Sequence, residues 1–193
     1  MISIYTGTPG SGKSLHIAQR IYHGLRIGRL TICNFEINLE YVSKRKAKSL
    51  PFKYIDNMDL NPDVLINISR EYFKGKGRIK EDAILLVIDE CQLLFNSREW
   101  QKTNRKSWLS FFSQHRKYGY EVVLVAQFDG MVDKQIRSLI EYDYKHRKAS
   151  NFGIVGRLIS VASLGKLFCC VKMWYPLGER IGSEFFRMDS RRR

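Results

Sequence analysis

The sequence lacks a recognisable cysteine motif for a metal site or a disulfide framework. No two of them stand in a CxxC arrangement, and no histidine lies at the spacing that zinc modules use. Three of the four fall within apolar runs, which favours buried thiols in a reducing compartment. A disulfide-stapled secreted domain and a zinc ribbon are therefore not expected. The four are Cys33, Cys91, Cys169 and Cys170.

The sequence also has no long uninterrupted hydrophobic run. Its longest apolar stretch, residues 152–171, contains Arg157, Lys166 and three glycines. A membrane span needs about 20 mostly apolar residues with few charges. We therefore expect a β-hairpin in this stretch. The first seven residues, MISIYTG, lack the basic start of a signal peptide, and we expect none.

Acidic residues are few relative to basic ones. The 193 residues contain 33 Lys and Arg but only 19 Asp and Glu, which gives a formal net charge of +14. Such a surplus favours a polyanionic partner, either nucleic acid or an anionic membrane surface. The alternative is a basic domain without such a partner. Apolar residues make up 44% and charged residues 27%, which is ordinary for one globular domain with a sizeable core.

Short apolar runs alternate with helical patterns along residues 1–138, which we interpret as a nucleotide-binding core. Runs such as ILLVI and EVVLVA are apolar throughout, as in strands buried on both faces of a parallel sheet. The alternation predicts an α/β fold with a mainly parallel central sheet flanked by helices. The expected strands are 2–5, 30–34, 84–88 and 121–126, and the expected helices are 13–25, 61–73 and 104–118.

The pattern changes after residue 138. Residues 139–148, 154–160 and 167–175 have an extended pattern, with a turn at Gly165. We interpret residues 139–193 as a β-rich extension with a basic tail. It belongs to a single domain that covers residues 1–193.

A glycine-rich motif, GTPGSGKS, follows the first predicted strand and opens the first predicted helix. Its spacing is that of a P-loop, in which backbone N–H groups and the helix dipole hold phosphates. Lys13 is expected to reach the β- and γ-phosphates and to act in catalysis, and the Ser14 hydroxyl is expected to bind Mg²⁺. A glycine-rich turn without a ligand is the alternative, which the flanking strand and helix disfavour. The residues assigned to nucleotide binding are Gly7, Thr8, Pro9, Gly10, Ser11, Gly12, Lys13, Ser14 and Leu15.

Two acidic residues end the apolar run ILLVI. Asp89 fits the carboxylate on the magnesium side of P-loop enzymes, either directly or through water. Glu90 fits a general base that polarises the attacking water. The alternative is that both residues only cap the next helix.

Gln127 ends the following apolar run, EVVLVA. In a parallel sheet its amide should emerge at the same edge as Asp89, where it could orient water near the γ-phosphate. A plain polar residue at a strand exit is the alternative. Arg116 is a candidate arginine finger, acting within the chain or toward a neighbouring subunit, although simple solvated charge explains it as well. Arg105 and Arg137 are weaker candidates.

Other sequence features concern the base of the bound nucleotide and the polyanionic partner. The guanine-specific NKxD motif is absent, which favours adenine. Basic loops at residues 44–48, 74–80 and 98–106 could contact phosphate backbones, although a solvated face explains each one alone. Trp108 and Phe112, four residues apart on one helix, fit a core position better than a base-stacking platform.

Four segments resemble the zonular occludens toxin (Zot) family, which includes filamentous-phage assembly ATPases. They are YTGTPGSGKS, LLVIDE, SQHRKYGYEVVLVAQ and IRSLIEYDYKHRK, within residues 1–150. The resemblance implies a motor ATPase related to hexameric DNA pumps, at the cytoplasmic face of the bacterial inner membrane. It implies nucleotide and Mg²⁺ at Lys13 and Ser14, paired acids at Asp89 and Glu90, and a γ-phosphate sensor at Gln127.

The expected function is therefore an ATPase that powers assembly or export of a filamentous phage. The expected cofactors are ATP and Mg²⁺. The expected partners are further copies of the chain in a ring, with a hexamer as the expected size, phage single-stranded DNA and other phage assembly proteins. The family's membrane span is absent from this chain, so anchoring would need a segment outside it. The alternatives are another P-loop DNA translocase or packaging ATPase, and a nucleotide-gated adaptor that does not hydrolyse ATP.

Overall fold

Short strands distributed along the chain build a sheet whose central part is parallel. The computed structural model describes residues 1–43, 47–96, 105–148 and 167–187. The sheet has eight strands in the order β3-β2-β4-β5-β1-β6-β7-β8, of which β7 and β8 are antiparallel to their neighbours. The strands are β1 Ile2–Thr6, β2 Leu30–Cys33, β3 Phe52–Tyr54, β4 Ile84–Ile88, β5 Tyr120–Val125, β6 Tyr142–Lys148, β7 Leu167–Trp174 and β8 Glu179–Arg187.

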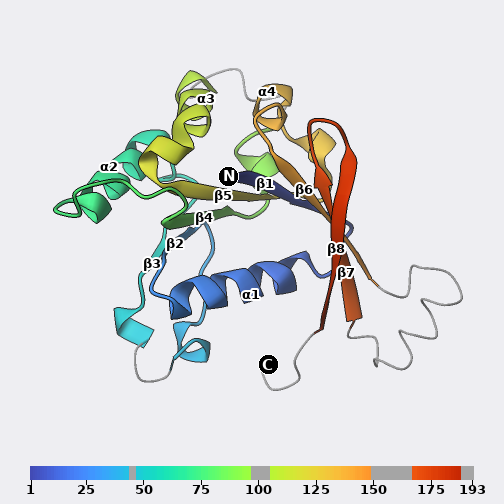
Figure 1. Ribbon diagram of the computed structural model, residues 1–193, viewed down its shortest axis with the longest axis horizontal. Helices are drawn as coiled ribbons and strands as arrows, with labels where there is room; N and C mark the ends of the chain where they lie inside the picture. The colour runs from blue at the N-terminus through green and yellow to red at the C-terminus, as the bar shows by residue number, and fades with distance from the viewer. Residues whose placement is uncertain (44–46, 97–104, 149–166, 188–193) are drawn as a thin grey trace, which may run out of the picture.

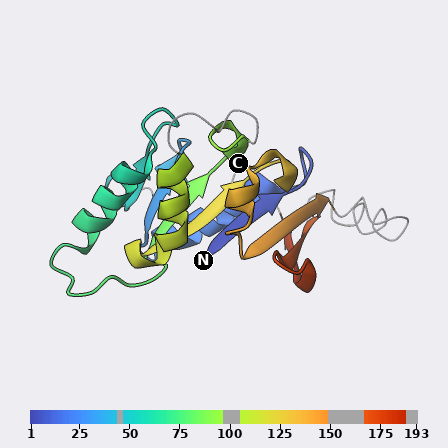
Figure 2. The same cartoon turned by 90° about the horizontal axis from the view of Figure 1, so that it is seen from above.

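Helices cover both faces of the sheet (Figures 1 and 2). One face carries α1 (Lys13–Arg26), which begins where the loop after β1 ends. The opposite face carries α2 (Pro62–Phe73), α3 (Arg105–Gln114) and α4 (Lys134–Arg137). This arrangement confirms the predicted α/β fold with a mainly parallel sheet between helices.

Each face of the sheet has its own apolar core. On the α1 face, Ile17, Ile21 and Leu25 recur at helical spacing and pack against β-strand side chains such as Val87 and Val123. On the opposite face, an aromatic group of Phe95, Trp108, Phe111 and Phe112 fills the space under α3. Trp108 and Phe112 are only 3% and 1% exposed, so the prediction that they belong to the core is confirmed.

Three charged side chains form a network between α1, the start of β2 and the centre of the sheet. Glu121, on β5, is 4% exposed and pairs with both Arg20 and Arg29. Arg20 also donates a hydrogen bond to the Tyr5 hydroxyl on β1 at 2.8 Å. Buried charges need such partners because an unpaired one would be strongly destabilising.

The α2 helix matches its sequence signals closely. Asn61 is its N-cap and accepts a hydrogen bond from the Val64 N–H at 3.0 Å, and Pro62 is the first helical residue. The third helix is shorter than predicted: α3 ends at Gln114, and a 3-10 turn covers His115–Tyr118 before Gly119. The short side-chain contact from His115 Nδ1 to the Phe112 carbonyl, 2.6 Å, accompanies this tightening.

The C-terminal part is rich in β-strands, as predicted, but its details differ. β6 begins at Tyr142 rather than at Leu139, because residues 139–141 follow the turn after α4. β6 pairs parallel to β1, so the parallel sheet continues beyond residue 139. β8 was not predicted as a separate strand. The expected strand at 154–160, the turn at Gly165, residue 104 of the expected helix and the basic tail lie outside the described residues, as do parts of two basic loops.

Candidate functional site

The glycine-rich loop after β1 adopts a conformation that depends on its glycines. Gly7, Gly10 and Gly12 have φ angles of 142°, 74° and 96°, a region that residues with a Cβ rarely adopt. The loop closes with a hydrogen bond from the Ser11 N–H to the Thr8 carbonyl at 3.1 Å. Lys13 then starts α1, so the amino end of the helix and its partial positive charge lie at the loop.

The underside of this loop is closely packed. A Cβ at Gly7 would lie 2.5 Å from the His146 carbonyl oxygen, and a Cβ at Gly12 would lie 2.7 Å from the Phe168 ring. The Ser11 hydroxyl is buried and has no hydrogen-bond partner among the described residues. A curled loop with an unsatisfied buried hydroxyl, at a helix amino end, fits a phosphate group.

Lys13 folds back over the loop. Its ammonium donates hydrogen bonds to the Gly7 carbonyl at 2.5 Å and to the Thr8 carbonyl at 3.3 Å. Burial lowers the pKa of Lys13, while the nearby carboxylates of Glu90 and Asp89 act in the opposite direction. The lysine and the two acids, which are 76 or more positions apart in the sequence, therefore lie close enough to interact.

Asp89 follows β4 and is held through its backbone by Asn34, the residue after β2. The Asp89 N–H donates to Asn34 Oδ1 at 2.7 Å, and the Asp89 carbonyl accepts from Asn34 Nδ2 at 2.8 Å. Asn57 accepts a further hydrogen bond from Asn34 Nδ2 at 2.8 Å. Neither asparagine is among the residues predicted from the sequence. A polar residue directly after the buried run LTIC was the signal that could have identified Asn34.

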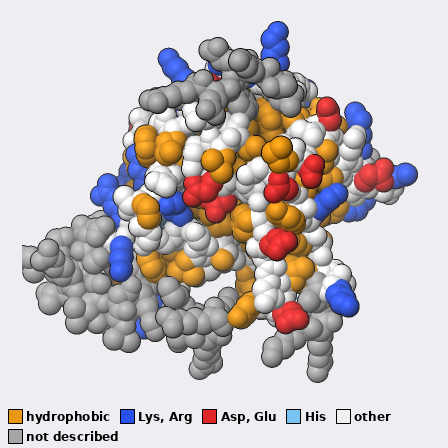
Figure 3. Space-filling view, turned by 180° about the vertical axis from the view of Figure 1, so that it is seen from behind, with side chains coloured by type: hydrophobic (Ala, Val, Ile, Leu, Met, Phe, Trp, Pro, Cys, Tyr) orange, Lys and Arg blue, Asp and Glu red, His pale blue; other side chains and the backbone are white. Residues whose placement is uncertain are grey.

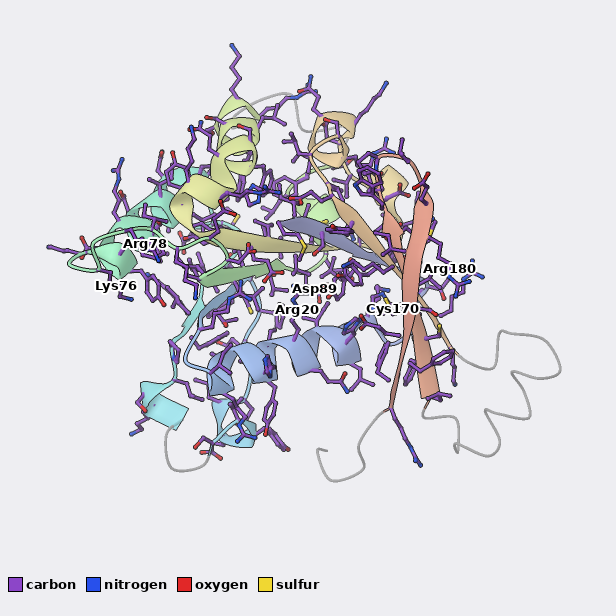
Figure 4. All side chains as sticks on the ribbon, viewed as in Figure 1. Arg20, Lys76, Arg78, Asp89, Cys170 and Arg180 are labelled. Carbon is purple, nitrogen blue, oxygen red and sulfur yellow. The ribbon has the colours of Figure 1, made fainter. Side chains whose placement is uncertain are left out.

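Burial raises the pKa of Asp89, while the Glu90 N–H and the Lys13 charge oppose the rise. Ser14 and Asp89 line one cavity of about 400 Å³, which continues along α1 past Leu15 toward Phe35 and Tyr41. A serine hydroxyl and a carboxylate are oxygen ligands of the type that Mg²⁺ takes. The residues present therefore fit a magnesium ion beside the phosphate loop. Figure 4 shows Asp89 on the side of the sheet that faces α1.

Glu90 has an unusual backbone for a residue other than glycine. Its φ of 47° and ψ of 43° lie in the left-handed region, and its side chain is exposed. Such a conformation is typically unfavourable by about 1–2 kcal/mol and is more frequent at functional sites. The Glu90 carboxylate accepts a hydrogen bond from Gln92. The turn directs the chain out of the strand immediately after Asp89.

Gln127 lies directly beside the phosphate loop. β5 lies between β1 and β4 in the sheet, so the residues that follow β5 emerge between Gly7 and Asp89. The Gly7 N–H donates to the Gln127 carbonyl at 3.0 Å, and the Gln127 side chain is exposed. The backbone hydrogen bond therefore brings Gln127 to the loop, as the sheet topology predicted.

Arg116 lies at the opposite end of the parallel strands, where β1 and β5 begin. Its guanidinium pairs with Glu141 at 2.8 Å, and Glu141 in turn accepts the Ile2 N–H at the start of β1. The phosphate loop follows the other end of β1, roughly 17 Å away at 3.3 Å per residue for five residues. Arg116 therefore does not reach the loop of its own chain, and the predicted role within the chain is not supported. Arg105 and Arg137 pair with Asp133 and Asp129.

We expect the substitution Arg116→Ala to leave nucleotide affinity of the monomeric chain unchanged within about twofold. The side chain is 52% exposed, so losing its ion pair should lower the free energy of unfolding by no more than about 1 kcal/mol. Equilibrium nucleotide binding and urea denaturation would measure both effects. A large loss of affinity in the monomer would contradict this placement.

The basic loop at residues 74–80 is separated from this site. Figure 4 shows Lys76 and Arg78 on the connection after α2, away from Asp89. The Lys76 ammonium lies 3.3 Å from the centre of the Tyr72 ring, a cation–π contact. On the face in Figure 3, Lys and Arg side chains are dispersed together with Asp and Glu side chains. The described part of that face has no single basic stripe.

Comparisons with known proteins agree with this fold. The family model described as zonular occludens toxin (Zot) matches residues 1–166. The Gene 1 protein of Salmonella phage IKe is 32% identical over 174 residues, which are 86% of this chain and 46% of that protein. The chain thus spans about half the length of the curated relatives that it matches.

Two solved structures have the same fold. One is the N-terminal domain of zonular occludens toxin from Neisseria meningitidis, with a TM-score of 0.54, 18% identity and coverage of 98% of this chain and 95% of that one. The other is the genome packaging NTPase B204 of Sulfolobus turreted icosahedral virus 2 in complex with ATP-gammaS, with a TM-score of 0.57, 16% identity and coverage of 97% of both chains. The fold is that of a P-loop NTPase.

Within residues 1–43, 47–96, 105–148 and 167–187, none of the helices has the length and apolar character required to cross a membrane.

Proposed function

Because this chain belongs to the zonular occludens toxin family, we propose that it is an ATP-binding and ATP-hydrolysing motor domain that powers assembly or export of a filamentous phage. The observation that carries the proposal is the convergence of a P-loop, Lys13, Asp89 and Glu90 at one edge of the sheet. The similarity to phage Gene 1 proteins supports the link to phage assembly.

The catalytic proposal assigns a role to each residue. The loop from Gly7 to Ser14 binds the phosphates through its N–H groups and the amino end of α1. Lys13 exchanges its carbonyl partners for phosphate oxygens and neutralises charge that develops during in-line attack. Glu90 accepts the proton of the attacking water, and Gln127 orients that water.

Mg²⁺ bound by Ser14 and Asp89 would supply positive charge to the phosphate oxygens. Asp89 binds Mg²⁺ as a carboxylate. Its burial raises its pKa and so opposes this ionised form. Asn34 fixes the Asp89 backbone on both its N–H and its carbonyl sides, so we propose Asn34 as a positioning residue for the acid.

The partners belong to the same proposal. We propose that copies of the chain assemble into a ring, with a hexamer as the expected size, at the cytoplasmic face of the inner membrane. The cargo would be phage single-stranded DNA, handed over with other phage assembly proteins, and a membrane segment would lie outside this chain. The net charge of +14 supports a polyanionic cargo.

Substitution of Lys13 provides the direct test. Steady-state phosphate release from ATP should occur with the wild-type chain, and we expect Lys13→Ala to lose it together with most of the nucleotide affinity. The matched control is Lys76→Ala, which removes a lysine from the basic loop after α2 and should leave phosphate release unchanged. If an assembled ring of the wild-type chain released no phosphate, the enzymatic proposal would fail.

A packaging or conjugative translocase is the second candidate, because the packaging NTPase B204 has the same fold. The two candidates differ in the nucleic acid that stimulates them. We expect single-stranded DNA to raise the rate of phosphate release more than duplex DNA does. Stronger stimulation by duplex DNA, with directional movement along it, would favour the packaging function.

A further inference from the structure

Three metal-ligating side chains meet beneath the phosphate loop, outside the nucleotide site. His16 lies in the first turns of α1, His146 in β6 and Cys170 in β7. One donor atom from each lies within 4.8 Å of the donor atoms of the other two, and His16 Nδ1 is 2.9 Å from His146 Nε2. Donor atoms of a tetrahedral metal site lie slightly farther apart than this pair, so small side-chain movements are sufficient. Figure 4 shows Cys170 close to the end of α1 that follows the loop.

The register of the sheet offers one candidate for a fourth donor. His146 is directly opposite Cys170 on β7, and Cys170 is directly opposite Glu184 on β8. Residues directly opposite each other point to the same face of a sheet, which here is the face that α1 covers. The charge of Glu184 acts on both His16 and Cys170. Because Glu184 lies on the edge strand and is exposed, its carboxylate can turn toward the group.

The surroundings of the two histidines suit metal ligands. Burial lowers the pKa of His16, and it lowers the pKa of His146 to about 4, which favours the neutral imidazole that binds a metal. His146 Nδ1 lies 3.2 Å from the Thr6 carbonyl, and a hydrogen bond donated there leaves Nε2 without a proton, as a metal ligand requires. The ring centroids of Tyr5 and Phe186 lie 5.1 and 4.9 Å from that of His16, so both rings pack beside it.

We propose that His16, His146, Cys170 and Glu184 form a tetrahedral site for a zinc ion. Two imidazole nitrogens, one sulfur and one carboxylate oxygen are the donors that Zn²⁺ takes in proteins, whereas Mg²⁺ and Ca²⁺ take oxygen. On binding, the Cys170 thiol releases its proton to solvent and its sulfur bonds to the metal. Burial raises the pKa of free Cys170 to about 12, so the metal is required to stabilise the thiolate.

The zinc ion would connect α1 to β6, β7 and β8 directly below the phosphate loop. His16 is two residues after Ser14, and the His146 carbonyl is the group that leaves no space for a Cβ at Gly7. The site is separate from the proposed ATPase chemistry. Its test therefore uses metal binding and stability, and either proposal can fail while the other holds.

Cobalt substitution provides the experiment. The full chain, purified without a metal-affinity tag and stripped with a chelator, is titrated with Co²⁺ and then with Zn²⁺. We expect one Co²⁺ per chain, with a thiolate-to-cobalt charge-transfer band and the intense visible bands of a tetrahedral ion, all displaced by one equivalent of Zn²⁺. Zn²⁺ should also raise the Tm of the stripped protein.

The neighbouring residues Cys170 and Cys169 provide a test variant and its matched control. Cys170→Ser should abolish the charge-transfer band, whereas Cys169→Ser should keep it, because residue 169 points to the other face of β7. Glu184→Gln should weaken Zn²⁺ binding on the order of 10-fold or more. Circular dichroism checks that each variant is folded. Absence of stoichiometric Co²⁺ or Zn²⁺ binding by the wild-type chain would overturn the proposal, and so would a charge-transfer band that survives in Cys170→Ser.

Discussion

We expect Glu90→Gln to bind ATP with nearly wild-type affinity and to lose hydrolysis by about 10²–10⁴-fold. The amide keeps the size of the side chain and its hydrogen bonding to Gln92 but cannot accept a proton from water. Lys13 and the loop remain intact, so the phosphates should still bind. Nucleotide binding measured by fluorescence and single-turnover phosphate release would separate the two steps.

The matched control for Glu90→Gln is Glu71→Gln, which removes a carboxylate from the exposed surface of α2, away from the loop. Its hydrolysis rate should equal that of the wild type. Hydrolysis by Glu90→Gln at the wild-type rate would show that the general base is a different group. A simultaneous loss of ATP binding would instead indicate that Glu90 has a structural role in the turn after Asp89.

Gly7→Ala should have the largest effect on the loop itself. The added Cβ would lie 2.5 Å from the His146 carbonyl oxygen and 2.7 Å from Ser11 Oγ, at a φ of +142°. The carbonyl belongs to β6, where His146 pairs with Cys170 of β7, so it cannot move without disturbing the β6–β7 pairing. We expect a loss of about 2–4 kcal/mol in the free energy of unfolding, and a loss of ATP binding. Urea denaturation and equilibrium binding would measure both.

Gly10→Ala is the control for this prediction, because a Cβ at position 10 of the same loop would point into open space. No atom lies within 4 Å of a Cβ at Gly10, so only the strain of its φ of +74° remains. That strain is about 1–2 kcal/mol. If Gly7→Ala were no less stable than Gly10→Ala, the close packing of the loop on β6 would not be important for stability.

The local parts of the site could be predicted from the sequence because each depends on a short motif. The phosphate loop lies between an apolar strand and a helix, and Asp89 ends a fully apolar run. The parallel order of strands then places Gln127 near both, since carboxyl ends of parallel strands share one edge. These predictions needed only periodicity, turn chemistry and the handedness of crossovers.

Other parts depend on strand register, which the sequence does not reveal. Asn34 acts on Asp89 because β2 pairs with β4, and the two residues are 55 positions apart. The location of Arg116 follows from its place before β5, at the amino end of a strand whose carboxyl end carries the site. Both facts require knowing which strands are neighbours.

The proposed zinc ligands also could not be predicted from the sequence. In the sequence, no cysteines and histidines stand at the short spacing of a zinc motif. His16 and His146 are 130 positions apart, and the register of β6, β7 and β8 brings the other donors into line. A non-local site of this type is invisible to spacing rules, because antiparallel pairing rather than sequence distance sets its geometry.

The network around Glu121 has a mechanical consequence. Arg20 and Arg29 connect α1 and the start of β2 to the middle strand of the sheet, and separating a buried pair typically costs about 3–5 kcal/mol. The helix after the phosphate loop is therefore anchored about halfway along its length and resists tilting.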